Sequence, residues 1–267
     1  MNRISVYLHI LKMGFVELLA FRVTIIMLAL SIPITLFARY YLLAALYDDG
    51  TTVIDGYNIR ELLTYLACAW LLRSFFRSGT DRRLGRQVRS GDIVFELMRP
   101  VDFMWLTLFK AMGKSLNRFV FISLPLIVIF LLGDILILSS DPVRWLYFFA
   151  LVGIGYVIAF EMQFLMGLMA FFIGYNISII WTVDLVLQIL SGLLLPLHFF
   201  PEQISKLLMA MPFRHIFYTP AQVFVGHAKL NEIPGFLLSA LMWAVVLGII
   251  NYLVYKRAEQ KLSIAGG

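Results

Sequence analysis

Long apolar stretches alternate with short polar ones along the whole chain. A helix needs about 20 mainly apolar residues to cross the hydrocarbon core of a bilayer. Six stretches meet that requirement, and the second is the weakest because charged residues crowd its ends. The predicted spans cover residues 23–47, 58–77, 116–138, 144–173, 177–199 and 233–255. The pattern therefore predicts an all-α membrane protein with six transmembrane helices.

Residues 3–19 precede the first span and carry too many charges to cross a membrane. Their apolar residues repeat at helical spacing, at positions 4, 8, 11, 15 and 18. This pattern predicts an amphipathic helix that lies in the cytoplasmic interface. Residues 1–22 would then form a separate element in front of a transmembrane domain over residues 23–267. The alternative is a simple extension of the first span.

Composition and charge support the membrane assignment. Hydrophobic residues make up 61% of the 267 and charged residues 14%, where a soluble domain carries about 25% charged residues. Of the 22 Lys and Arg residues, 16 fall at the N-terminus, between residues 73 and 118, or at the C-terminus. This bias follows the positive-inside rule rather than a nucleic-acid-binding face. It predicts that both termini are cytoplasmic, and no removable signal peptide is expected.

The basic region between the second and third spans predicts a cytoplasmic loop over residues 78–115. Ser90 or Asp92 could begin a short helix that Arg99 and Pro100 would end. One side of that helix is apolar, with Ile93, Val94, Leu97 and Met98, and the other carries Asp92, Glu96 and Arg99. An amphipathic helix below a membrane can rest on lipid headgroups or dock in a groove on a soluble protein. The sequence alone leaves both open.

A proline-bounded segment separates the last two spans. Pro201 can begin a short helix and Pro212 can end it. The apolar stripe of this helix comprises Ile204, Leu207, Leu208 and Met211. We predict a re-entrant helical hairpin on the outer side over residues 199–230, packed against the fifth and sixth spans, with Lys206 and Arg214 directed to water or headgroups. An ordinary surface loop is the alternative.

Acidic and amide side chains interrupt the fourth and fifth spans. Glu161 lies midway along one and Asp184 lies in the first half of the other, with Gln163 and Gln188 nearby. A charge at this depth is costly unless it faces water, a partner or a protein interior. These four residues are therefore candidates for the translocation pathway, and structural pairing is the alternative. The spacing of His198, His215 and His227 fits no compact metal motif, so no metal site is predicted.

Two motifs resemble the permease subunits of ABC-2-type exporters, in particular the six-span viologen-exporter-like subfamily. The first is the pattern G-D-I-x-x-x-L-x-R-P at residues 91–100. The second is an S-G-x-x-x-P signature with later prolines in residues 190–226. Its anchor positions are Ser191, Gly192, Pro196, Pro201, Pro212, Pro220 and Gly226. With the order of the spans included, the resemblance covers nearly the whole chain.

This resemblance implies a transport subunit in a bacterial plasma (inner) membrane that hydrolyses no ATP itself. A separate ABC ATPase subunit would bind ATP and Mg, and a second permease subunit, identical or a sibling, would complete the pathway. The residues assigned to ATPase coupling are Gly91, Asp92, Ile93, Glu96, Leu97, Arg99 and Pro100. Those assigned to an outer gate are Pro196, Phe199, Phe200, Pro201, Pro212 and Phe213.

Other functions are weighed against this one. Gly113-Lys114-Ser115 resembles the end of a phosphate-binding loop, but that motif needs a glycine where Leu108 stands. A proton-coupled secondary transporter that uses Glu161 is the main alternative, although no internal repeat favours it. A lipid-modifying membrane enzyme would need a His/Asp/Ser constellation that the sequence does not show. The substrate remains open between a lipophilic cation, a lipid and a glycolipid.

Overall fold

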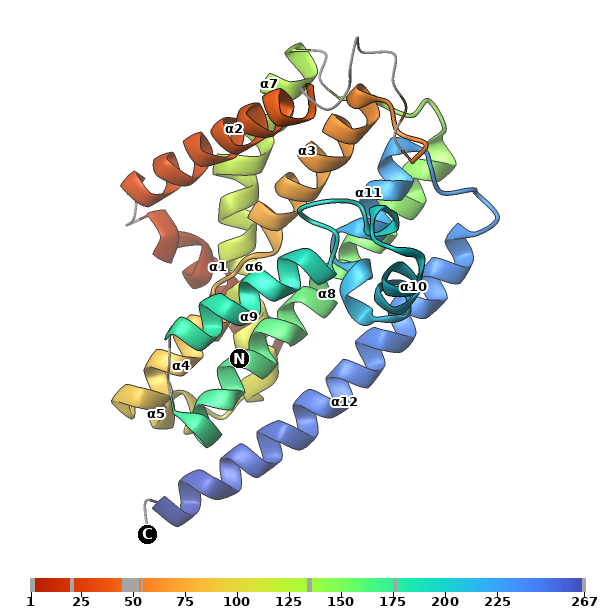
Figure 1. Cartoon of the computed structure of the whole chain (residues 1–267). Helices are drawn as coiled ribbons and strands as arrows, with labels where there is room; N and C mark the ends of the chain where they lie inside the picture. Colours follow the sequence, from red (N-terminus) through yellow and green to blue (C-terminus); the bar gives the residue numbers. More distant parts are fainter. Residues whose placement is uncertain are drawn as a thin grey trace.

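The computed structural model describes residues 3–19, 22–44, 53, 55–133, 136–174 and 177–265. Most of them lie in helices (Figure 1). The elements of the first half are α1 (Arg3–Leu19), α2 (Arg22–Ala44), α3 (Ile59–Phe76), α4 (Thr80–Ser90), α5 (Ile93–Leu97), α6 (Phe103–Arg118), the π-helix η2 (Phe119–Ser123) and α7 (Leu124–Leu132). The second half comprises α8 (Pro142–Ile173), α9 (Ile177–Leu190), η3 (Leu197–Phe199), α10 (Glu202–Ala210), η4 (Pro212–His215), α11 (Tyr218–Val225) and α12 (Ile233–Ala265).

Each of the six predicted spans coincides with a helix. In the part of the chain that the structure describes, four helices are long and apolar enough to cross a membrane. The four are Ile25–Leu42 of α2, the continuous run Phe103–Leu132 through α6, η2 and α7, the whole of α8, and Ile233–Lys261 of α12. The all-α membrane fold is therefore confirmed. The fifth predicted span is shorter than expected, because α9 is apolar but has only 14 residues.

Helix α3, the weakest of the predicted spans, lies at the centre of the core. It carries Arg60, Glu61 and Arg73, yet Leu62, Tyr65 and Ala69 along its middle are completely buried. Asn58 caps its first turn by accepting a hydrogen bond from the Glu61 amide at 2.8 Å. The rest of the chain packs around the middle of α3, and α3 is not one of the four helices that are long and apolar enough to cross a membrane.

Helix α6 begins at Phe103 and so overlaps the predicted loop of residues 78–115. The run Phe103–Leu132 has 30 residues and is therefore about 45 Å long, whereas the hydrocarbon core is about 30 Å thick. The run is therefore longer than the hydrocarbon core is thick, and its two lysines, Lys110 and Lys114, both lie in its N-terminal half.

The N-terminal helix α1 lies directly against α6, and glycine makes this close approach possible. A Cβ atom on Gly113 would lie 2.0 Å from the backbone oxygen of Leu11, and one on Gly14 would lie 2.4 Å from that of Lys110. The buried face of α1 centres on Ile10 and Gly14, whereas Leu8 of the predicted apolar stripe is exposed. The predicted helix is thus present, and Ile10 and Gly14 face the protein while Leu8 of the predicted stripe stays on the outer surface of the helix.

Gly113→Ala should lower the midpoint of thermal unfolding and release α1 from α6. The added methyl group meets backbone atoms that cannot rotate away, and overpacking of this kind costs about 1–3 kcal/mol or more. Gly153→Ala is the matched control, because nothing lies within 4 Å of a Cβ at that position of α8. Equal midpoints for the two variants, measured in detergent solution, would contradict the close α1–α6 crossing.

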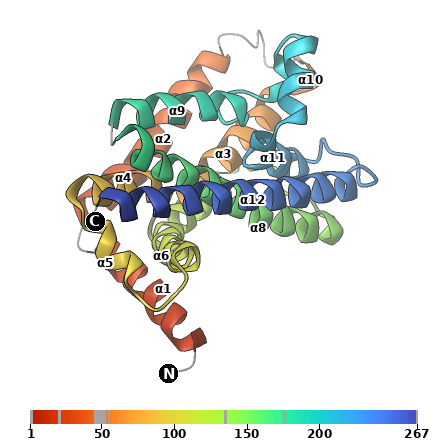
Figure 2. The same cartoon turned by 90° about the horizontal axis from the view of Figure 1, so that it is seen from below.

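The two ends of the molecule differ in character. Helices α4 and α5 lie at one end together with the C-terminal part of α12, and α10 and α11 lie towards the other end (Figures 1 and 2). The short helices α10, η4 and α11 occupy the segment for which a hairpin was predicted. Part of their packing follows the prediction, because η4 contacts both α9 and α12, and α11 in addition packs against α3 and α8.

Candidate functional site

Helices α4 and α5 form a compact unit joined at Gly91, whose φ of 81° is in the left-handed region that favours glycine. Ile93 is buried in a small apolar cluster with Leu84 of α4, Phe103 of α6 and Phe164 of α8. This cluster fixes α5 to the rest of the chain. The sharp turn at Gly91 and the buried Ile93 thus account for two residues of the 91–100 motif.

A network of charges continues this attachment to α1. Glu96 of α5 is buried and accepts hydrogen bonds from the Arg83 guanidinium at 3.2 and 3.3 Å. The Lys110 Nζ atom lies 3.5 Å from Glu96 and 3.9 Å from Glu17, and Lys114 Nζ lies 2.8 Å from Glu17. We call these five residues the charge network. It connects α5, α4, α6 and α1 by side chains far apart in sequence.

The pKa values of this network reflect its burial. Burial alone would raise the pKa of Glu96, but Arg83, a hydrogen bond from Gln87, Lys110 and Arg99 outweigh it, so the pKa is lowered. Burial lowers the pKa of Arg83, and Glu96 and Glu17 oppose that change. Glu96 is therefore ionised at neutral pH and holds α5 by charge as well as by packing.

The exposed side of α5 agrees only in part with the predicted one. The sequence placed Ile93, Leu97 and Met98 toward a partner and Glu96 among the polar contacts, but Ile93 and Glu96 are buried and Leu97 is half-buried. Of the predicted apolar side, Val94 (45%) and Met98 (76%) are exposed, and Phe95 (71%), which was not predicted, is exposed beside them. We call these three the α5 patch. Other motif residues border it, and the exposed ones are Gly91, Asp92, Arg99 and Pro100.

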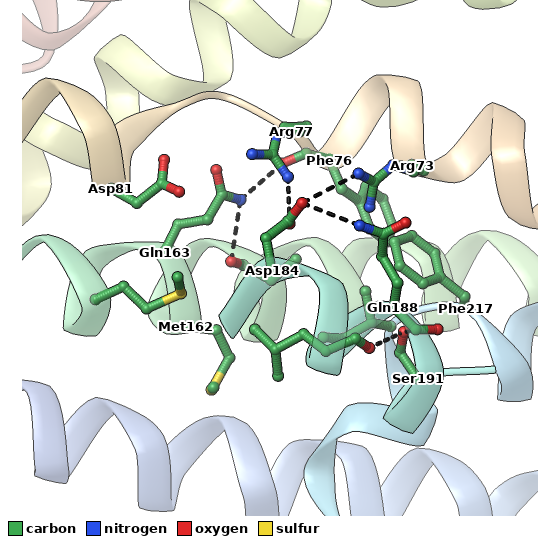
Figure 3. Close-up of a pocket in the computed structure, with 14 residues that line it drawn as sticks. Arg73, Phe76, Arg77, Asp81, Met162, Gln163, Asp184, Gln188, Ser191 and Phe217 are labelled. Atoms are coloured by element: carbon green, nitrogen blue, oxygen red, sulfur yellow. Dashed lines mark hydrogen bonds and ion pairs between the residues drawn. The ribbon is translucent and has the colours of Figure 1, made fainter. Parts of the chain in front are cut away.

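Asp184 of α9 forms ion pairs with Arg73 of α3 and with Arg77, the residue that directly follows α3 (Figure 3). Its Oδ2 atom accepts a hydrogen bond from Arg73 Nη2 at 3.2 Å and one from Gln188 Nε2 at 3.0 Å, and its Oδ1 atom contacts Arg77 Nη1. The carboxylate thus neutralises part of the charge that α3 brings to this depth. Asp184 and Gln188, predicted as pathway candidates, are brought together here.

The Asp184 cluster lines a cavity, and Gln163 of α8 lines the same cavity (Figure 3). The Gln163 side chain faces the end of α3. Its side-chain oxygen accepts hydrogen bonds from Ser78 Oγ and the Gly79 amide, both at 3.1 Å, and its nitrogen donates to the Phe76 carbonyl at 3.0 Å. These bonds satisfy backbone groups where α3 ends and the chain turns into α4. Gln163 therefore fastens the turn between α3 and α4 to α8.

Glu161 is separate from this cluster and lies in the contact between α8 and α12. Asn251 of α12 donates a hydrogen bond to the Glu161 carbonyl at 3.1 Å, and a Cβ on Gly248 would lie 3.1 Å from the Glu161 carboxylate. Its Oε2 atom is buried without a hydrogen-bond partner among the described residues. Of the interpretations that the sequence left open, the geometry places Glu161 in a helix interface and not beside Asp184.

Most of the predicted outer-gate residues lie around the short helices after α9. Pro196 and Pro212 are buried, whereas Phe199, Phe200 and Phe213 are half-buried and Pro201 is exposed. Lys206 is 75% exposed, as expected for a side chain directed to water or headgroups. Arg214 differs from that expectation, because it is half-buried with its guanidinium 5.2 Å from the Phe236 ring centroid.

Arg73 and Arg77, the partners of Asp184, were not among the predicted site residues. Arg73 was treated only as a charge near the end of the second span. The signal was present in the spacing, because residues four apart lie on one face of a helix and can share a carboxylate. The sequence could not show that Asp184 is the acceptor, because Asp184 lies 111 residues after Arg73.

A family model described as "ABC-2 family transporter protein" matches residues 33–266. The chain belongs to this family. A comparison with curated proteins gives no match. The family assignment confirms the resemblance to ABC-2 permeases that was inferred from the two sequence motifs.

As an ABC-2 family transporter, this protein is a multi-pass membrane subunit of an ABC transporter rather than the subunit that hydrolyses ATP. The family implies a lipid bilayer around it and an ABC ATPase as its partner. The match concerns the family as a whole, so the viologen-exporter-like subfamily remains a prediction from the motifs.

Proposed function

We propose that this ABC-2 protein is an export permease that docks on a separate ATPase subunit through the α5 patch and forms the translocation pathway together with a second permease subunit. The ATPase would carry ATP and Mg. In this arrangement α4, α5 and both termini are cytoplasmic, as the distribution of Lys and Arg favours. The end that carries α10 and α11 is then the outer side, where Phe199, Phe200 and Phe213 would contribute to a gate.

The observation that carries this proposal is the exposed α5 patch on a helix that is otherwise firmly attached. Large apolar side chains that remain exposed at one place mark protein or membrane interaction sites. Phe95 and Met98 are the two most exposed side chains of the patch. Ile93 and the charge network attach α5 to α4, α6 and α1. A movement of the docked ATPase would therefore displace these helices together with α5.

Secondary transport driven by protons has less support. The argument for it rested on Glu161, and Glu161 contacts Asn251 and Gly248 of α12 as a residue of a helix interface would. The family assignment also favours transport coupled to an ABC ATPase.

The docking proposal predicts that charge on the α5 patch abolishes coupling. Phe95→Asp combined with Met98→Asp should reduce the ATPase activity that co-purifies with the tagged chain by at least about tenfold, because buried aromatic anchors contribute about 2 kcal/mol or more at interfaces. The chain itself should still insert and unfold at an unchanged midpoint, since both side chains are exposed.

The matched control is Phe95→Leu combined with Met98→Leu, which keeps the patch apolar. This control should retain most of the co-purifying activity. Full ATPase recovery with the two aspartates would show that α5 rests on lipid headgroups or elsewhere, and it would overturn the docking proposal.

A further inference from the structure

A second cavity lies beside the Asp184 cluster and opens between different helices. It has a volume of about 360 Å³ and is formed by α2, α3, the start of α4, the junction of α6 with η2, and α9. Its apolar wall comes from Leu28 and Ile32 of α2 and Ile122 of η2. The proposed docking at α5 makes no use of this cavity.

Four arginines line this cavity: Arg73, Arg77, Arg82 and Arg118. We call them the arginine cluster. Asp184 pairs with Arg73 and Arg77. Within the described ranges, no ion pair joins Arg82 or Arg118 to a carboxylate. Asp81, the neighbour of Arg82 in sequence, lines the other cavity. Even with Asp81 and Asp184 counted against the four arginines, the cluster retains an excess of positive charge.

Donor atoms of the arginine cluster remain without acceptors. The Nε atom of Arg118 and the Nη2 atom of Arg77 are buried and have no hydrogen-bond partner among the described residues. Leaving charged donors buried and unpaired is costly, typically more than the 1–3 kcal/mol of a neutral group. An anion in the cavity would supply the missing acceptors and the missing negative charge.

Three of the four guanidinium groups lie over tryptophan rings. Arg77 and Arg82 lie over the Trp181 ring, at 5.8 and 4.8 Å from its centroid, and Arg73 lies 5.7 Å from that of Trp70. Stacked guanidinium groups lose less freedom on binding, and their planar donors match the oxygens of a phosphate. The stacking therefore prepares a site for a phosphate group rather than merely placing charge in the membrane.

We propose that the arginine cluster binds the phosphate of an anionic amphiphile whose apolar part lies along Leu28, Ile32 and Ile122. The cavity offers cationic donors next to an apolar wall formed by α2 and η2, and a phospholipid-like molecule has the two matching parts, an anionic phosphate next to an apolar chain. Lipophilic cations, one of the substrate classes that the sequence left open, are repelled from this cavity.

The test uses the full-length chain, washed free of lipid in an uncharged detergent. Dioctanoyl phosphatidylglycerol should raise the midpoint of thermal unfolding in a saturable way. Dioctanoyl phosphatidylcholine, which carries no net charge, and inorganic phosphate at the same concentrations should not. An equal effect of phosphatidylcholine would show an apolar slot only, and an equal effect of inorganic phosphate would show a site for the free anion; either result overturns the proposal.

Arg118→Gln separates a binding role from a structural one. It should weaken binding of dioctanoyl phosphatidylglycerol by about tenfold or more, as expected for a lost charge-assisted hydrogen bond. Without lipid, the same variant should unfold at an equal or higher midpoint, because it removes a cation that has no partner. Arg89→Gln, on the exposed end of α4, is the matched control and should bind as the wild type does.

Two results would contradict the assignment to a lipid phosphate. One is an Arg118→Gln variant that unfolds at a lower midpoint while its response to phosphatidylglycerol is unchanged. The other is a loss of dimer in that variant, again with an unchanged lipid response, which would show that the arginine cluster pairs with a second copy of the chain.

Discussion

Glu96→Leu is expected to detach α5 from the rest of the protein. Removing one partner of a buried ion pair leaves the other charge uncompensated and costs about 3–5 kcal/mol. Arg83 would be left buried, facing Lys110 across the vacated site. Amide hydrogen exchange within residues 93–97 should therefore accelerate by at least about 100-fold.

The double variant Arg83→Met with Glu96→Leu is the control for this experiment. It removes both charges and fills their place with apolar atoms, so it should recover most of the lost protection. No recovery would show that the charge network acts through something other than the Arg83–Glu96 pair. Because the folded-state pKa of Glu96 is lowered, its contribution should be fully present at neutral pH and should be lost only at acidic pH, below the ordinary pKa of a glutamate, as the pH falls through the lowered pKa.

Asp184→Asn should have an effect of similar size inside the membrane. The substitution keeps the shape of the side chain but leaves Arg73 and Arg77 without their carboxylate. Two neighbouring arginines without a carboxylate at the end of α3 repel each other, so we expect about 3–5 kcal/mol of destabilisation. The measurement is the midpoint of thermal unfolding in detergent, together with the amount of protein that accumulates in the membrane.

Gln188→Leu provides the comparison, because it removes a hydrogen bond to Asp184 without changing the charge. Its cost should be close to 1 kcal/mol. If Asp184→Asn and Gln188→Leu are equally mild, water or lipid already neutralises the two arginines, and the ion pairs do not hold α9 to α3.

The family and the fold class could be predicted because both depend on features that are local in sequence. Hydropathy averaged over some 20 residues does not depend on how a helix is rotated, so it located a helix at every predicted span. The motifs at residues 91–100 and 190–226 occur in short stretches, and their order was enough for the ABC-2 family. Boundaries were less certain, as α9 and α6 show, because proteins tolerate spans shorter or longer than the bilayer.

The orientation of side chains was decided only by the tertiary structure. A helix of five residues such as α5 is too short for its periodicity to show which side is buried, and Ile93 was assigned to the wrong side. Arg73 of α3 pairs with Asp184 of α9, and α11 packs against α3 and α8. Both contacts join segments that are far apart in the sequence. The sequence by itself determined a helical ABC-2 membrane protein with a basic region between its second and third spans. Three-dimensional packing determined which charges pair and which arginines remain without an acceptor, because desolvated charges are stabilised by neighbours in space and not by neighbours in the chain.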